Sequence, residues 1–149
     1  MSTRSEIAIQ NADGSISSIY CHWDGYLEGV GSTLNKHYGS YRLGLSIIEQ
    51  NDCSSLGETI EESCFYNTWR NEDTKSKKFD NEYHFMKAFA DDIFAEYIYL
   101  FKDNAWYVSE CKLVDNPSDN YSHCIGYHTK FKKLDIALNE LKEEGVQNA

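Results

Sequence analysis

One stretch of the sequence decides the fold: YIYLFKDNAWYVS, residues 97–109. Two apolar and aromatic runs, 97–101 and 105–109, flank a polar KDN turn, and this pattern predicts a β-hairpin. Both faces of both strands carry apolar or aromatic side chains. The hairpin is therefore expected in the middle of a sheet that is covered on both sides.

A second hairpin is predicted near the start of the chain. Residues 5–10 alternate in polarity, the residues NADG at 11–14 supply turn chemistry, and residues 15–23 alternate again. Successive side chains of a strand point to opposite faces. The second strand therefore has one face of Ile19, Cys21 and Trp23 and another of Tyr20, His22 and Asp24.

Apolar residues at helical spacing predict the helices. These are a pair of short helices over 27–38 and 41–48, a helix from Asp80 or Asn81 to about Ala95, and a last helix from about Lys130 to Glu144. The third has a predicted buried stripe of Met86, Phe89, Ala90 and Ile93. Loops are expected at 51–57, 70–78 and 115–123, and a short strand at 64–69.

These elements predict a fold class. We expect a single α+β domain over residues 1–149, with an antiparallel sheet of about four strands formed by the two hairpins. Three or four helices are expected to pack on one face of that sheet. No internal repeat or linker interrupts the sequence.

The charge balance excludes several classes of function. The chain has 14 Lys and Arg against 24 Asp and Glu, a formal net charge of -10. Binding nucleic acid directly needs a basic footprint that this chain lacks, and an anionic membrane would repel it. No run approaches the roughly 20 apolar residues of a membrane span, and the first residues do not resemble a signal peptide. We expect a soluble intracellular protein.

The cysteines and histidines are the candidate metal ligands. The cysteines lie at 21, 53, 64, 111 and 124, an odd number without a C-x-x-C pair, so reduced thiols are expected rather than a disulfide framework. The histidines lie at 22, 37, 84, 123 and 128. Neighbours such as Cys21 and His22 point to opposite faces of a strand, so a structural zinc site would need ligands from distant segments. No cofactor is expected, with such a zinc site as the alternative.

His22 and Asp24 are the best candidates for acid–base chemistry, because they lie two residues apart on one strand face, next to Gly25. The favoured interpretation is structural: the two side chains hydrogen-bond to order the turn. Together with Tyr26 they are also the predicted residues of a ligand site. No catalytic residue is assigned.

The run IYCHWDGYLEGVG at 19–31 resembles a family of small, mostly uncharacterised bacteriophage and prophage proteins. Further matches are TRSEI at 3–7, VGSTL at 30–34, SSLGE at 54–58, and EYIYLF followed by WYV within 96–108. Leu27 replaces the proline that usually follows Gly-Tyr. The resemblance implies an accessory protein of the host cytoplasm that binds host machinery, such as a CRISPR–Cas effector or a restriction enzyme.

The sequence and this resemblance together favour a non-enzymatic, anti-CRISPR-like inhibitor of a host nucleic-acid-handling or defence protein. Its acidic groups would steer it to a basic surface, and exposed Tyr or Trp would anchor it. The predicted partner-binding residues are Glu61, Glu62, Glu72, Asp73, Asp91 and Asp92. The alternatives are a module that sequesters a small nucleotide-like ligand at His22, Asp24 and Tyr26, and an enzyme that uses His22 and Asp24.

Overall fold

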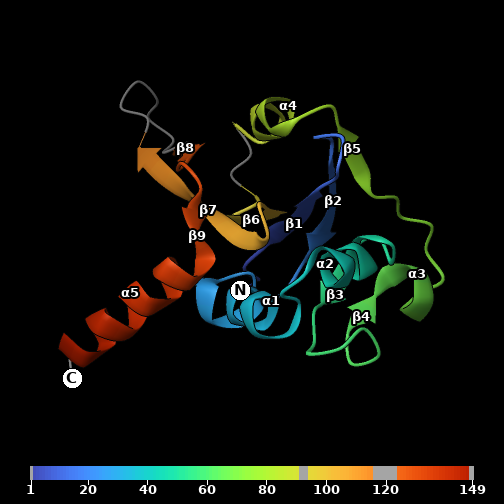
Figure 1. Ribbon diagram of the computed structural model, residues 1–149, viewed down its shortest axis with the longest axis horizontal. Helices are drawn as coiled ribbons and strands as arrows, with labels where there is room; N and C mark the ends of the chain where they lie inside the picture. The colour runs from blue at the N-terminus through green and yellow to red at the C-terminus, as the bar shows by residue number, and fades with distance from the viewer. Residues whose placement is uncertain (1, 91–93, 116–123, 148–149) are drawn as a thin grey trace.

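The computed structural model describes residues 2–90, 94–115 and 124–147, and their framework is a mixed β-sheet (Figure 1). The strands are β1 (Ser5–Gln10), β2 (Ile16–Cys21), β3 (Cys53–Ser55), β4 (Cys64–Phe65), β5 (Lys77–Phe79), β6 (Tyr97–Lys102), β7 (Ala105–Asp115), β8 (Cys124–His128) and β9 (Lys132–Lys133). The helical elements are η1 (Leu27–Gly31), α1 (Ser32–His37), α2 (Tyr41–Ile48), α3 (Tyr66–Trp69), α4 (Glu82–Ala88) and α5 (Leu134–Gln147). Within these residues the strand order is β4-β3-β2-β1-β6-β7-β8, with β5 also paired to β2 and β9 to β7.

Two antiparallel hairpins form the centre of the sheet, and both were predicted. β1 pairs with β2, and β6 pairs with β7. The hairpins meet through β1 and β6, which run parallel from the pair Ser5–Tyr97 to the pair Ile9–Phe101. A parallel pair needs a long crossover connection, which residues 11–96, including β2, supply. The fold is α+β as expected, but the prediction of a four-stranded antiparallel sheet is wrong.

Helices cover the central strands from both sides. On one face, the broad face, residues such as Ile7 and Tyr99 pack against side chains of η1, α1, α2 and α5. On the other, the α4 face, Ala8 and Ile98 pack against Phe85 of α4. The predicted double covering of the 97–109 hairpin is therefore confirmed, whereas the prediction that the helices pack on one face is wrong.

The stretch between α2 and α4 holds three strands that periodicity cannot reveal. β3 and the first two residues of β5 lie in segments predicted as loops, and the strand predicted at 64–69 is β4 followed by α3. These strands have three, two and three residues, too few for an alternating pattern to stand out. Pairing with β2 and with each other defines them instead.

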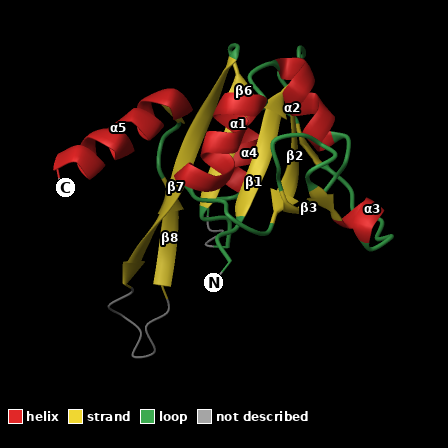
Figure 2. Cartoon of the chain, turned by 90° about the horizontal axis from the view of Figure 1, so that it is seen from below, coloured by secondary structure: helices red, strands yellow, loops and turns green. Residues whose placement is uncertain are grey.

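The two later helices differ from their predicted bounds. α4 ends at Ala88 rather than near Ala95, and its fully buried residue is Phe85, while the predicted Ala90 is exposed. α5 begins at Leu134 because the two preceding lysines pair with β7 as β9. Figure 2 shows α5 and the β7–β8 hairpin projecting from the body of the molecule. No helix among the described residues is both long enough and apolar enough to cross a bilayer.

Candidate functional site

The predicted ligand site begins at a sharp turn after β2. Asp24 adopts a left-handed φ of 60°, and its carbonyl oxygen accepts a 2.7 Å hydrogen bond from the Val30 N–H. A Cβ atom at Gly29 would lie only 2.2 Å from that oxygen, so the turn requires glycine at this position. The backbone between β2 and η1 is thereby fixed.

A buried tyrosine supports this turn from the sheet. The Tyr99 hydroxyl donates a 2.7 Å hydrogen bond to the Gly25 carbonyl oxygen. Burial raises the pKa of Tyr99 well above its ordinary value of 10, so this hydroxyl keeps its proton and acts as a donor. Tyr99 therefore has a structural role.

His22 bonds to a neighbour other than the predicted one. Its Nδ1 lies 2.6 Å from the Tyr20 hydroxyl, and its ring meets the Trp23 ring edge-on, with 4.8 Å between centroids. The Asp24 carboxylate makes no hydrogen bond or ion pair with any residue that the structure describes. The expected hydrogen bond between His22 and Asp24 is therefore wrong. Tyr26 is 39% exposed, and a ligand held by His22, Asp24 and Tyr26 stays a prediction.

Arg4 extends the polar group around His22. It precedes β1, whose first residue pairs with Cys21, so Arg4 lies across from His22 on the α4 face. Its guanidinium group lies near the Tyr20 hydroxyl, and its Cζ lies 5.6 Å from the Phe94 ring centroid. Burial raises the pKa of Tyr20, and Arg4 partly opposes this. We call Arg4, Tyr20 and His22 the Arg4 cluster.

A buried carboxylate lies in the same part of the α4 face. Glu6 is only 2% exposed and accepts hydrogen bonds from Ser18 Oγ at 2.6 Å and Lys77 Nζ at 3.1 Å. Burial raises the pKa of Glu6 above its ordinary value of 4.5, while Lys77 and Ser18 act against the shift. The alternation of residues 5–10 places Glu6 on a strand face but gives no sign that this face is covered.

Three exposed glutamates gather in the loop between β3 and β4: Glu58, Glu61 and Glu62. Glu58 Oε1 lies 3.8 Å from His37 Nε2. Within the described parts of the chain, Glu61 and Glu62 form no ion pair. We call residues 56–63 the acidic loop; no lysine or arginine in the described part of the chain forms an ion pair with its glutamates.

Internal bonds fix the shape of the acidic loop. The Ser63 hydroxyl accepts a 2.8 Å bond from the Gly57 N–H and donates a 2.7 Å bond to the Thr59 carbonyl oxygen. The hydroxyl of Tyr38, the residue after α1, donates a 2.9 Å hydrogen bond to the Gly57 carbonyl oxygen and so holds the loop. Ile60 packs against the core of the broad face. The glutamates are therefore presented by an ordered backbone.

The other described carboxylates predicted to bind a partner have ion-pair partners, unlike Glu61 and Glu62. Glu72 Oε1 lies 3.8 Å from Arg70 Nη1, and Asp73 Oδ1 lies 3.0 Å from Lys75 Nζ. Both are exposed ion pairs, which contribute little to stability but reduce the local charge. The last two residues of the predicted set lie outside the described residues: Asp91 and Asp92.

An exposed tryptophan follows the acidic loop in the chain. Trp69 ends α3, directly after the edge strand β4, and is 58% exposed. The Arg70 guanidinium carbon lies 4.6 Å from its ring centroid. We call the acidic loop together with Trp69 the acidic edge.

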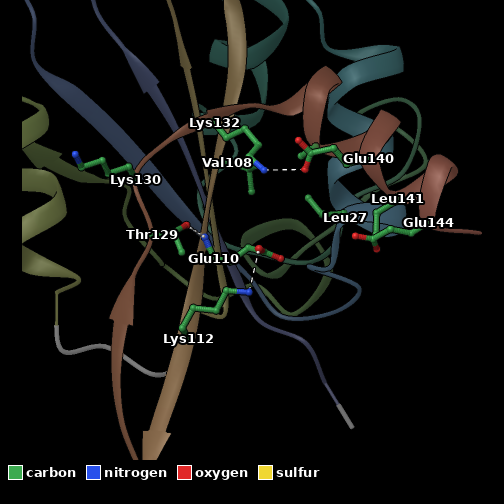
Figure 3. Close-up of a pocket in the computed structure, with 11 residues that line it drawn as sticks. Leu27, Val108, Glu110, Lys112, Thr129, Lys130, Lys132, Glu140, Leu141 and Glu144 are labelled. Carbon is green, nitrogen blue, oxygen red and sulfur yellow. Dashed lines mark hydrogen bonds and ion pairs between the residues drawn. The ribbon is translucent and has the colours of Figure 1, made fainter.

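A cleft of about 470 Å³ opens between β7 and α5 (Figure 3). Its apolar lining is Leu27, Val108, Ala137 and Leu141. Its charged lining is Lys112, Lys130, Lys132, Glu110, Glu140 and Glu144. Two ion pairs already engage four of these groups, Lys132–Glu140 at 2.8 Å and Lys112–Glu110 at 3.4 Å. The cleft is therefore nearly balanced in charge, and the sequence did not predict it.

The cysteines give no metal centre within the described residues. Cys21 and Cys53 face each other across β2 and β3 and are both buried. A hydrogen bond with Cys21, together with burial, raises the pKa of Cys53 well above its ordinary value of 9.0, so Cys53 stays a thiol. No three His, Cys, Asp or Glu side chains gather as a metal site would, as far as the chain is described.

Comparison with protein-family models, with curated proteins and with solved structures gives no match. The resemblance to phage proteins therefore stays a prediction from the sequence motifs.

Proposed function

We propose that this chain is a non-enzymatic inhibitor that binds a basic, nucleic-acid-handling surface of another protein through its acidic edge. The observation that carries the proposal is the unpaired pair Glu61 and Glu62, held on an ordered loop next to the strand that leads to Trp69. No catalytic residue and no cofactor enter the proposal.

The acidic loop is suited to binding because its conformation is set before a partner arrives. Association costs free energy for every loop and side chain that it orders. Here the hydroxyl groups of Ser63 and Tyr38 already hold the backbone at Gly57. A partner therefore has only the glutamate side chains themselves to order.

Charge and aromatic area have separate roles at the acidic edge. Glu61 and Glu62 form no ion pair with any residue that the structure describes, so their field extends into solvent and raises the association rate with a positively charged surface. Trp69 supplies a large exposed ring of the kind that dominates interface energetics. A surface evolved to bind nucleic acid has the positive charge that this arrangement complements.

The resemblance to phage proteins narrows the partner. In that context the target is a host defence or nucleic-acid-handling protein, such as a CRISPR–Cas effector or a restriction enzyme, in the host cytoplasm. The inhibitor would occupy the surface that otherwise holds nucleic acid, and it would need no chemistry of its own.

An affinity capture tests this proposal. The tagged protein is incubated with bacterial lysate at salt concentrations of about 50 mM and about 500 mM, which span weak and strong screening. We expect a nucleic-acid-handling protein to be retained at low salt and lost at high salt. The variant with Glu61→Gln and Glu62→Gln should retain much less of it.

A second adjacent pair of exposed glutamates is the matched control. Glu143→Gln with Glu144→Gln on α5 removes the same charge at another site. This control should capture as much partner as the unaltered protein. Equal capture by both double variants, or capture indifferent to salt, would contradict the role of the acidic edge.

A further inference from the structure

The Arg4 side chain combines a positive charge with partial burial. Arg4 is half-buried, and among the described residues it forms no ion pair. Its guanidinium group lies near two neutral groups, the Tyr20 hydroxyl and the Phe94 ring. A guanidinium group offers five donors in a planar fork that matches carboxylate or phosphate oxygens. It is therefore placed to accept an anion from solution.

Two further polar groups face the same region. The Tyr20 hydroxyl and the His22 ring are 2.6 Å apart on adjacent positions of the α4 face, beside Arg4. Both side chains are half-buried rather than covered, so their outer atoms can reach a ligand. Arginine, tyrosine and histidine together give a charged donor, a hydroxyl and an imidazole, which are groups that bind phosphate oxygens.

Of the carboxylates near the cluster, Glu6 has a cationic partner, while Asp52 accepts a backbone N–H. Glu6 is bonded to Lys77 and Ser18. Asp52 accepts the Tyr20 backbone N–H through its Oδ1 at 2.9 Å. The Lys77 ammonium group adds positive charge to the α4 face, so the local balance differs from the net charge of -10.

An exposed aromatic ring borders the cluster. Trp23 is 44% exposed, its ring contacts His22, and its backbone N–H bonds to the Ser54 carbonyl oxygen at 2.9 Å, which extends the pairing of β2 and β3. The indole is thus held at a fixed place next to the cluster. An exposed indole ring of this kind can stack on a nucleobase.

We propose that the Arg4 cluster binds the phosphate of a nucleoside phosphate, with the base stacked on Trp23. The site differs from the predicted trio of His22, Asp24 and Tyr26, since only His22 is shared. It also uses none of the glutamates of the acidic edge, so the experiments below test it independently of the proposed inhibitor function.

Calorimetric titration tests this proposal with AMP, CMP, GMP and UMP, with inorganic phosphate, and with the matching nucleosides. We expect at least one mononucleotide to bind more tightly than both inorganic phosphate and its own nucleoside, because only the mononucleotide uses cluster and indole together. Equal affinity for inorganic phosphate and the nucleotides, or no binding heat for any of them, would overturn the proposal.

Variants locate the site. Arg4→Gln should weaken nucleotide binding by about tenfold or more, the size expected for a charge-assisted hydrogen bond. Trp23→Ala should reduce the nucleotide to the affinity of inorganic phosphate. Arg42→Gln, which removes the same charge from an exposed position on α2, is the matched control and should bind like the unaltered protein.

Folding of the variants is checked separately by thermal denaturation. If Arg4→Gln unfolds, Tyr20→Phe provides a milder test, because it removes only one hydroxyl and should still weaken nucleotide binding several-fold. Nucleotide affinity unchanged in a folded Arg4→Gln or Tyr20→Phe variant, or lowered equally by Arg42→Gln, would place the binding elsewhere and overturn the assignment.

Discussion

The buried ion pair between Glu6 and Lys77 gives the sharpest prediction on stability. Glu6 is 2% exposed, whereas the Lys77 side chain is 44% exposed and approaches it from β5. Replacing Lys77 by methionine keeps the aliphatic chain but leaves the Glu6 carboxylate with Ser18 alone. Breaking a fully buried pair costs about 3–5 kcal/mol, and the exposure of Lys77 reduces this to about 2 kcal/mol at neutral pH.

The effect has a defined dependence on pH. Burial raises the pKa of Glu6 above 4.5 in the folded protein. The contribution of Glu6 to the free energy of unfolding is therefore complete below the pKa of the unfolded chain and is lost as pH rises through the folded pKa. Lys77→Met raises this pKa further. The variant should therefore nearly match the unaltered protein at about pH 4 and fall increasingly below it towards pH 8.

Thermal and urea denaturation between pH 4 and pH 8 measure this difference. About 2 kcal/mol corresponds to a midpoint lower by about 6 °C for a chain of this size. Lys78→Met is the control, because Lys78 is the exposed neighbour on the same strand and makes no bond to Glu6. A loss of stability that does not change with pH, or that Lys78→Met reproduces, would refute the reasoning.

Two more substitutions probe the scaffold. Gly29→Ala should lower the free energy of unfolding by about 3 kcal/mol in a urea titration, because the added Cβ would lie 2.2 Å from the Asp24 carbonyl oxygen. Gly39 has open space around it, so Gly39→Ala is the control and should change the free energy of unfolding by less than about 0.5 kcal/mol. Trp106→Phe should cost about 2–3 kcal/mol by urea denaturation, since it removes the 2.7 Å bond from the indole N–H to the Tyr38 carbonyl oxygen and leaves that oxygen buried. A variant of Trp106 as stable as the unaltered protein would show that water or another donor replaces the indole.

The parts of the fold that were predicted correctly are those fixed by local pattern. The hairpins around residues 11–14 and 102–104 can be predicted from their turn residues and from the strand patterns on either side. The parallel pairing of β1 with β6, which joins the two hairpins, was missed because it depends on the path of the intervening chain and not on any local pattern. β3, β4 and β5 were missed for a related reason, since their partners lie far away in the sequence.

In the candidate sites, too, local pattern was predicted from the sequence and tertiary contacts were not. His22 was identified from the strand pattern. Its neighbours Tyr20 and Arg4 could be identified only from the pairing of β1 with β2 in the structure. Glu61 and Glu62 were singled out as charges, yet only the structure distinguishes them from charges that have ion-pair partners. Those distinctions rest on tertiary distances, which a sequence does not contain.

Competition with nucleic acid is the most direct test of the inhibitor account. The partner obtained by affinity capture is saturated with its own nucleic acid, and this protein is then added while release of the labelled nucleic acid is followed. The account predicts that the protein displaces nucleic acid, and that the variant with Glu61→Gln and Glu62→Gln needs a several-fold higher concentration to do so. A stable ternary complex, with nucleic acid still bound, would contradict it.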